Sequence, residues 1–218
     1  MQLEQERQQI VDYGRKLIRS GLTTGSGGNL SLLNRQHNLI AIGPSGIDYD
    51  EVGVEDVVIV DRRGDIVDGR WKPSSELGFH LALYDRRPDV AAVVHTHSVY
   101  ATTMACLHWE IPAVHYLVGF SGNKVPLAPY ATFGTPELAR SVTQSIGGYN
   151  AVLLANHGLV AVGGSLKAAF NVAEEIELVA RLYYQTRSVG EPVLVPEVEM
   201  TRVLEKFKTY GQPDETKN

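Results

Sequence analysis

The chain has 218 residues, of which 44% are hydrophobic and 21% charged, so it is long enough to form one compact domain with its own core. A formal net charge of −5 without a lysine and arginine cluster argues against a nucleic-acid-binding surface. The single cysteine, Cys106, excludes disulfides within the chain, and no apolar run approaches the ~20 residues that span a bilayer. We therefore expect one cytoplasmic domain over residues 1–218, with roughly 211–218 as a flexible C-terminal tail, and no membrane or nucleic-acid partner.

The N-terminal part predicts a helix followed by two strand pairs. Apolar residues recur at helical spacing over residues 3–20, and Gly21 is a typical residue after the end of such a helix. Strands with apolar alternation flank the polar turn at residues 34–38, and residues 57–69 predict a second pair around a tight turn.

A helix and a buried strand are expected in the middle of the chain. The helix should begin at Ser74 or Ser75, carry Glu76 in its first turn, and end before Pro88. The apolar run at residues 90–94 predicts the strand, and two histidines follow at its carboxyl end.

The C-terminal part alternates again between helices and a strand. Thr135 followed by proline predicts a helix start, and residues 151–155 predict a buried strand that ends in a turn with a third histidine. Ser165 should cap a long helix with an apolar stripe that ends at Gly190, and a last helix is expected near residues 197–206.

These elements predict an α/β fold in three layers, with a central, mostly antiparallel mixed sheet between two layers of helices. Strands that arrive in hairpins form antiparallel pairs, and interspersed helices cover the faces of the sheet. The chain contains no GxGxxG motif and no Walker loop, which argues against a doubly wound nucleotide-binding fold.

Three histidines make a metal site the favoured chemistry. His95 and His97 are two residues apart, so on an extended segment their rings point to the same side. Such a pair also occurs by chance in many chains, but His157 stands in a comparable position after another buried strand. Three neutral imidazoles leave a fourth position open on zinc, which is the usual arrangement of a catalytic site.

Two roles are compatible with the position of Glu76 in the sequence, and the sequence does not decide between them. It is either a carboxylate that favours the positive end of a helix dipole, or a general base beside the metal. The remaining histidines, His37, His80, His108 and His115, are expected to be structural.

Three separated segments are rich in N–H and O–H donors. They are the glycine-rich loop at residues 25–29, the turn at 43–46, and the serine pair at 74–75. Each alone is typical of a turn or a cap, but together they would surround a phosphate without a lysine, because backbone amides and helix N-termini bind such anions.

Eight motifs in order resemble the class II aldolase and epimerase superfamily, and most closely its L-fuculose-phosphate aldolases. They are GSGGNLS (25–31), GPSGIDY (43–49), KPSSE (72–76), VVHTHS (93–98), IPAVHY (111–116), APYATFGT (128–135), NHGL (156–159) and EKFKTYG (205–211).

The resemblance implies a class II aldolase-like fold and a zinc-dependent carbon–carbon lyase. It implies reversible cleavage of L-fuculose 1-phosphate, a small phosphorylated ketose, to dihydroxyacetone phosphate and L-lactaldehyde through a metal-stabilised enediolate. One zinc ion per subunit would be held by His95, His97 and His157, with Glu76 as the acid/base that also ligates the metal when substrate is absent.

The family pattern also implies a phosphate site and a shared active site. The phosphate-binding residues would be Gly28, Asn29, Ser45, Gly46, Ser74 and Ser75, with Ser45 in place of a threonine in the relatives. Tyr116, a donor to the aldehyde oxygen, and Tyr210 would each reach a neighbouring subunit of a homotetramer whose active sites lie at subunit interfaces.

Other members of the superfamily remain as alternatives. An L-ribulose-5-phosphate 4-epimerase is expected to carry aspartate where this chain has Glu76. A methylthioribulose-1-phosphate dehydratase or an aldolase of 5-deoxy sugars would share the three histidines. A non-catalytic module like the head domain of adducin should have lost the ligands that this chain retains.

Overall fold

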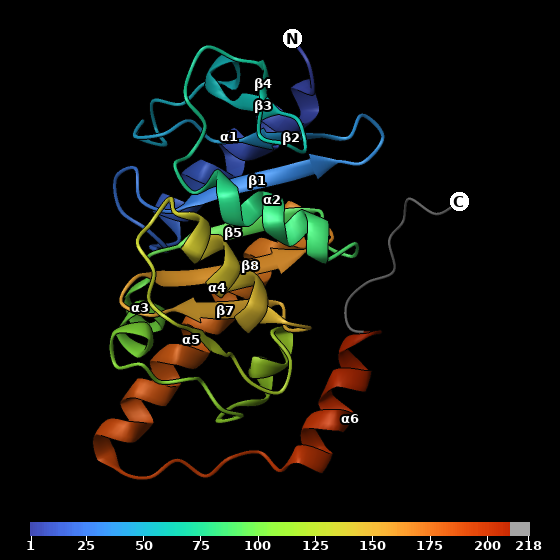
Figure 1. Cartoon of the computed structure of the whole chain (residues 1–218). Coiled ribbons are helices and arrows are strands. Elements are labelled where there is room, and N and C mark those ends of the chain that lie inside the picture. Colours follow the sequence, from blue (N-terminus) through green and yellow to red (C-terminus); the bar gives the residue numbers. More distant parts are fainter. Residues whose placement is uncertain (210–218) are drawn as a thin grey trace.

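An eight-stranded sheet crosses the molecule in the order β4-β3-β2-β1-β5-β8-β7-β6 (Figure 1). The computed structural model describes residues 1–209. Within that range the strands are β1 (Asn29–Asn34), β2 (Leu39–Ile42), β3 (Val58–Val60), β4 (Ile66–Asp68), β5 (Ala92–Thr96), β6 (Leu127–Ala128), β7 (Ala151–Leu154) and β8 (Gly158–Gly163). The β6–β7 pair is parallel and the other neighbours are antiparallel, which confirms the predicted mixed sheet.

Helices cover both faces of the sheet and complete the predicted three layers (Figure 1). One face packs against α1 (Glu4–Arg19), α3 (Val99–Cys106) and α5 (Leu166–Val189). The other packs against α2 (Leu77–Arg86) and α4 (Pro136–Ile146), while α6 (Glu197–Phe207) contacts the short 3-10 helix η2 (Tyr116–Phe120). A second 3-10 helix, η1 (Val54–Asp56), contacts α1.

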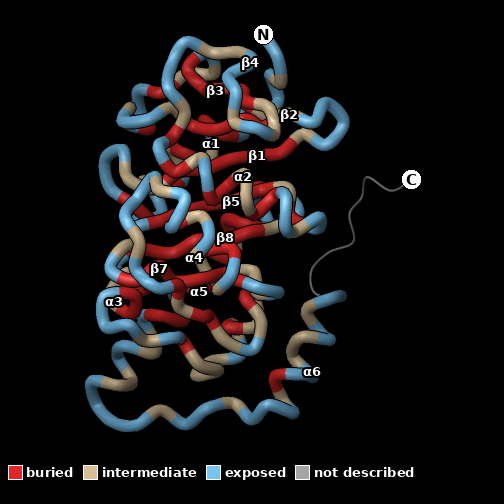
Figure 2. Tube along the Cα trace, viewed as in Figure 1, coloured by how far each residue is buried: buried red, intermediate tan, exposed pale blue. Residues whose placement is uncertain are grey.

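The apolar core divides into two clusters because successive strand residues point to opposite faces. Along β5, Ala92 and Val94 pack into the cluster under α1, α3 and α5, whereas Val93 packs into the cluster under α2 and α4. The buried stretches in Figure 2 follow the central strands. By the same alternation, His95 points toward the α2 face, where its ring meets Phe79 with the ring centres 5.7 Å apart.

The central strands align residues that are far apart in sequence. In the antiparallel register Asn29 of β1 lies opposite His95 of β5, and His95 lies opposite Val160 of β8. The turn between β7 and β8 therefore lies beside the end of β5, and it carries His157.

Several helix ends follow the sequence signals. The N–H groups of Gly21 and Leu22 donate to the carbonyl oxygens of Ile18 and Leu17, which is the pattern of a Schellman cap. The hydroxyls of Thr135 and Ser165 accept N–H groups in the first turns of α4 and α5.

Three features of the fold differ from the predictions. Helix α2 begins at Leu77, so Glu76 precedes the helix with non-helical φ and ψ of −99° and 11°. Strand β5 ends two residues later than predicted, which places His95 within the strand. Strands β6 and β8 were not predicted; β6 has only two residues, too few for a periodic signal, whereas β8 is an apolar run bounded by glycines.

Helix α3 directly follows the metal-site segment and is capped from a distant helix. The carboxylate of Glu177 on α5 accepts the backbone N–H groups of Tyr100 and Ala101 at 2.9 and 2.8 Å. A negative charge at a helix N-terminus is stabilising, so α5 fixes the position of the chain just beyond His97.

The predicted tail, residues 211–218, lies outside the described part of the chain. Among residues 1–209, no helix combines the length and apolar character needed to cross a membrane.

A Gly158→Ala substitution should destabilise the fold, because an added Cβ would collide with the carbonyl oxygen of Thr96 and touch the His97 ring. We expect the free energy of unfolding, measured by urea denaturation, to fall by about 1–3 kcal/mol. The matched control is Gly148→Ala, where an added Cβ meets no atom within 4 Å, and it should remain within about 1 kcal/mol of the wild type. Equal effects of the two substitutions would contradict this account of Gly158.

Candidate active site

The three predicted histidines meet at one edge of the sheet. His95 lies in β5, His97 follows one residue after its end, and His157 lies in the β7–β8 turn. Their ring centres are 4.8 Å (His95–His97), 4.8 Å (His95–His157) and 5.3 Å (His97–His157) apart. One nitrogen of each ring lies within 4.8 Å of the others, a grouping that can hold a metal ion.

The backbone determines which nitrogen of His95 carries the proton. His95 Nδ1 lies 2.9 Å from the carbonyl oxygen of Leu159 in β8, and a carbonyl oxygen only accepts. Nδ1 therefore carries the hydrogen, which leaves Nε2 as the nitrogen that can present a lone pair to a metal ion. A backbone carbonyl on the second ring nitrogen is the usual way in which a ligating histidine is oriented.

Glu76 lies against the histidines and is only 7% exposed. Its Oε2 is 3.2 Å from His95 Nε2 and accepts a hydrogen bond of 3.0 Å from Asn29 Nδ2, while Oε1 is 3.5 Å from His157 Nε2. Burial raises the pKa of Glu76, but His95, His157 and Asn29 together lower it to about 2. The side chain is therefore a carboxylate at neutral pH.

The donor set fits a divalent metal. His95 Nε2 and His97 Nε2 are 3.0 Å apart, and among residues 1–209 nothing forms a hydrogen bond with the buried Oε1 of Glu76. Burial and the neighbouring imidazoles lower the pKa of both His97 and His157, so these rings are neutral at pH 7. Neutral imidazoles and a carboxylate converging on one point are ligands of zinc and similar ions.

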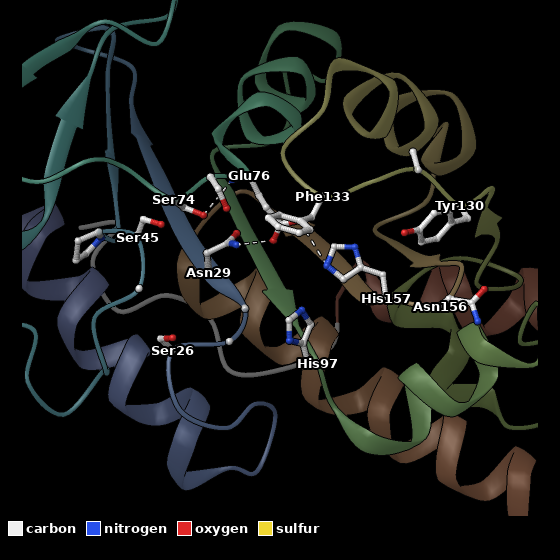
Figure 3. A pocket seen from close by; sticks show the side chains of 16 residues that line it. Ser26, Asn29, Ser45, Ser74, Glu76, His97, Tyr130, Phe133, Asn156 and His157 are labelled. Atoms are coloured by element: carbon white, nitrogen blue, oxygen red, sulfur yellow. Dashed lines mark hydrogen bonds and ion pairs between the residues drawn. The ribbon is translucent and has the colours of Figure 1, made fainter.

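A cavity of about 390 Å³ opens beside the histidines. Its walls contain all six residues predicted to bind phosphate: Gly28, Asn29, Ser45, Gly46, Ser74 and Ser75. Glu76, His97 and His157 also line it. Figure 3 shows Ser26, Asn29, Ser45 and Ser74 on one side of the cavity, with His157 toward the other side.

Backbone pairing brings the donor segments together. The Ser45 N–H donates to the Lys72 carbonyl and the Ser74 N–H donates to the Gly43 carbonyl, which joins the 43–46 turn to the serine pair. Gly28 has a φ of +68°, and an added Cβ would lie 2.5 Å from the His95 carbonyl oxygen, so the glycine-rich loop crosses close over β5.

The cavity lining also contains three residues that the sequence analysis did not assign to the site. Tyr130 and Phe133 line the cavity and are 62% and 65% exposed, and Asn156 adjoins His157 with a left-handed φ of +53°. Figure 3 places Tyr130 and Asn156 beyond His157. The aromatic residues belong to the APYATFGT segment, which was the available signal for them.

Tyr116 does not line this cavity. Its ring lies 4.7 Å from that of His115 and 6.4 Å from that of Phe207, and it is 48% exposed. Any role for Tyr116 in chemistry thus requires a cavity of another subunit, and Tyr210 lies outside the described residues. Both assignments stay predictions.

The remaining histidines make hydrogen bonds away from the metal cluster. His37 contacts Asn34 in the β1–β2 turn, and His115 Nδ1 accepts the Leu117 N–H at the start of η2. His108 Nε2 contacts Asn156 Oδ1 at 2.6 Å. His80 is completely buried behind Asn29.

The family model described as Class II Aldolase and Adducin N-terminal domain matches residues 8–184. The chain belongs to this class II aldolase family.

Relatives of known activity match it over nearly their full length. A 5-deoxy-D-ribulose 1-phosphate aldolase of Bacillus thuringiensis serovar kurstaki is 54% identical over 97% of this chain and 100% of the relative. The L-fuculose phosphate aldolase of Escherichia coli K12 is 42% identical over 93% of this chain and 94% of the relative.

A solved L-fuculose 1-phosphate aldolase has the same fold. It superposes with a TM-score of 0.92 at 45% identity and covers 94% of this chain and 96% of its own. This class II aldolase is therefore a metal-dependent carbon–carbon lyase with a three-histidine site. The predicted resemblance and fold class are confirmed.

Removing one imidazole should abolish metal retention. We expect the purified wild type to hold about one zinc ion per chain and His97→Ala to hold almost none, because two imidazoles and a carboxylate bind zinc more weakly. Elemental analysis after dialysis measures the difference. His37→Ala, which alters an exposed histidine of the β1–β2 turn, should retain the wild-type content, and a His97→Ala chain with full zinc would contradict the ligand assignment.

Proposed function

We propose that this class II aldolase reversibly cleaves a short 5-deoxy ketose 1-phosphate to dihydroxyacetone phosphate and an aldehyde. The observation that supports it is the cavity itself, where Glu76, His97 and His157 adjoin a wall of N–H and O–H donors and the buried His95 contacts Glu76. The polar wall suits the phosphate, and the Glu76 carboxylate lines the same cavity as His97 and His157.

The phosphate would be bound without a lysine or arginine. The assigned donors are Gly28, Asn29, Ser45, Gly46, Ser74 and Ser75, all on the cavity wall. Ser74 and Ser75 precede α2, whose positive dipole end favours an anion.

Glu76 is the proposed acid/base. A zinc ion held by His95, His97 and His157 would supply the Lewis acid that stabilises the enediolate of dihydroxyacetone phosphate. In condensation Glu76 removes a proton from C3 of dihydroxyacetone phosphate, and in cleavage it returns a proton to that carbon. Its ionised state at neutral pH suits the first step, and its Oε1 lies 3.5 Å from His157 Nε2.

A proton donor for the aldehyde oxygen is proposed from a second chain. Tyr116 is half-exposed on η2, and Tyr116 and Tyr210 match family tyrosines that reach a neighbouring active site. We therefore propose a homotetramer in which each cavity is completed at a subunit interface.

Two sugar phosphates are candidates for the substrate. The 54% identity with a 5-deoxy-D-ribulose 1-phosphate aldolase exceeds the 42% identity with an L-fuculose phosphate aldolase. Cleavage between C3 and C4 of 5-deoxy-D-ribulose 1-phosphate releases acetaldehyde, a small apolar fragment for the Tyr130 and Phe133 side of the cavity. L-Fuculose 1-phosphate, which the sequence motifs favoured, remains the second candidate because of the close match in fold.

Glu76→Gln should retain zinc but lose cleavage, because the amide keeps the shape of the side chain and cannot take up a proton. We expect kcat to fall by about 10²- to 10⁴-fold. Steady-state kinetics measure kcat, and elemental analysis measures the zinc content. Glu51→Gln, on an exposed turn, is the matched control. Near-normal turnover by Glu76→Gln would remove Glu76 from the acid/base role.

A substrate panel should separate the candidates. Release of dihydroxyacetone phosphate from 5-deoxy-D-ribulose 1-phosphate should exceed that from L-fuculose 1-phosphate by at least about tenfold in kcat/KM, since one hydroxyl and one carbon distinguish the aldehydes. A chelator should abolish both reactions. A preference for L-fuculose 1-phosphate would make that sugar the assigned substrate. Formation of xylulose 5-phosphate from L-ribulose 5-phosphate would indicate an epimerase. The absence of product from every ketose would refute the proposal.

A further inference from the structure

A line of buried hydrogen bonds runs from the interior of the protein to Glu76. Tyr84 OH lies 2.6 Å from Ser31 Oγ, and Ser31 Oγ lies 2.6 Å from His80 Nδ1. His80 Nε2 lies 2.5 Å from Asn29 Oδ1, and Asn29 Nδ2 donates to Glu76 Oε2 at 3.0 Å. These residues come from β1 and α2 and from the position just before α2.

With a neutral His80 ring, only one arrangement of hydrogens satisfies every bond in this line. A carboxylate oxygen only accepts, so the Asn29 amide must direct its NH₂ group to Glu76 and its Oδ1 to His80. His80 must then carry its hydrogen on Nε2, accept with Nδ1 from the Ser31 hydroxyl, and leave the Ser31 oxygen to accept from Tyr84. All four donors consequently point toward Glu76, and aligned hydrogen bonds of this kind strengthen one another.

Burial keeps the groups in these states. Ser31 and His80 are 0% exposed and Tyr84 is 2% exposed, so a broken bond would leave a polar group without water. Burial lowers the pKa of His80 to about 3 and raises that of Tyr84, so the ring stays neutral and the phenol stays protonated. Phe79 stacks on the His80 ring at 4.5 Å with an interplanar angle of 18°, which limits its rotation.

We propose that His80 is a positioning residue that fixes the orientation of the Asn29 amide, and through it the donor character of the cavity wall. Asn29 lines the cavity, and within residues 1–209 its second N–H makes no hydrogen bond. With Oδ1 held by His80, this N–H is the group that Asn29 offers to an anionic substrate. A flipped amide would present an oxygen to the phosphate and to Glu76, which is repulsive for both.

The tautomer of His80 tests the inference without substrate or metal. In protein with ¹⁵N-labelled histidine, long-range nitrogen–proton NMR correlations distinguish the two neutral tautomers of each ring. The expected result is an Nε2–H tautomer for His80, assigned by the loss of its signals in His80→Met. An Nδ1–H tautomer or a doubly protonated ring at pH 7 would overturn the inference.

Paired variants test the consequence for the site. His80→Met keeps the length of the side chain but has no donor, whereas the amide nitrogen of His80→Gln takes the place of Nε2. We expect His80→Met to lower the affinity for dihydroxyacetone phosphate, measured by calorimetry, and kcat by about 10- to 100-fold each with zinc content unchanged. His80→Gln should restore most of both, and His37→Met is the matched control on the surface.

The expected effect on kcat rests on the proposed function, but the His80 inference and the proposed function can fail separately. If the wild type cleaves a ketose 1-phosphate but His80→Met binds and turns over within about twofold of it, the His80 inference is wrong and the function stands. Equal losses in His80→Met and His80→Gln would assign His80 a purely structural role. If the wild type cleaves nothing, the function fails, and the tautomer still decides the inference.

Discussion

The hydrogen bond from His95 Nδ1 to the Leu159 carbonyl oxygen is the constraint on which the site depends. It joins a metal ligand on β5 to the backbone of β8, so the position of the ligand is set by the pairing of two central strands. The same pairing places the β7–β8 turn, and with it His157, beside the end of β5. The positions of the three histidines therefore follow from the pairing of the central strands, and a catalytic site benefits from such supports.

Polar groups are buried here at a cost to stability that the surrounding hydrogen bonds reduce. Glu76 and Asn29 line the cavity, His80 lies behind Asn29, and all three side chains are buried. Within residues 1–209 each has a hydrogen-bond partner that suits its state, except for Glu76 Oε1, which makes no hydrogen bond and lies 3.5 Å from His157 Nε2. A buried carboxylate oxygen in this position beside three imidazoles fits a site that can bind a metal ion.

The cavity joins a wall of N–H and O–H donors to exposed aromatic residues. The proposed phosphate-binding residues come from segments that are tied to each other and to β5 by backbone contacts. Tyr130 and Phe133, by contrast, are mostly exposed side chains of the cavity lining. Since one fold supports several sugar-phosphate reactions, the specificity of this class II aldolase should reside in such exposed residues and not in the metal cluster.

The sequence by itself determined the local elements and the chemistry of the candidate residues. Helical periodicity, the caps at Gly21 and Ser165, and the three histidines after buried strands depend on neighbouring residues, and all were visible in the chain. Strand β8, the exclusion of Glu76 from α2, and the line from Tyr84 to Glu76 were decided by the tertiary structure. These features depend on which strands pair and in what register, and contacts between residues some 50 positions apart leave no periodic signal in a single sequence.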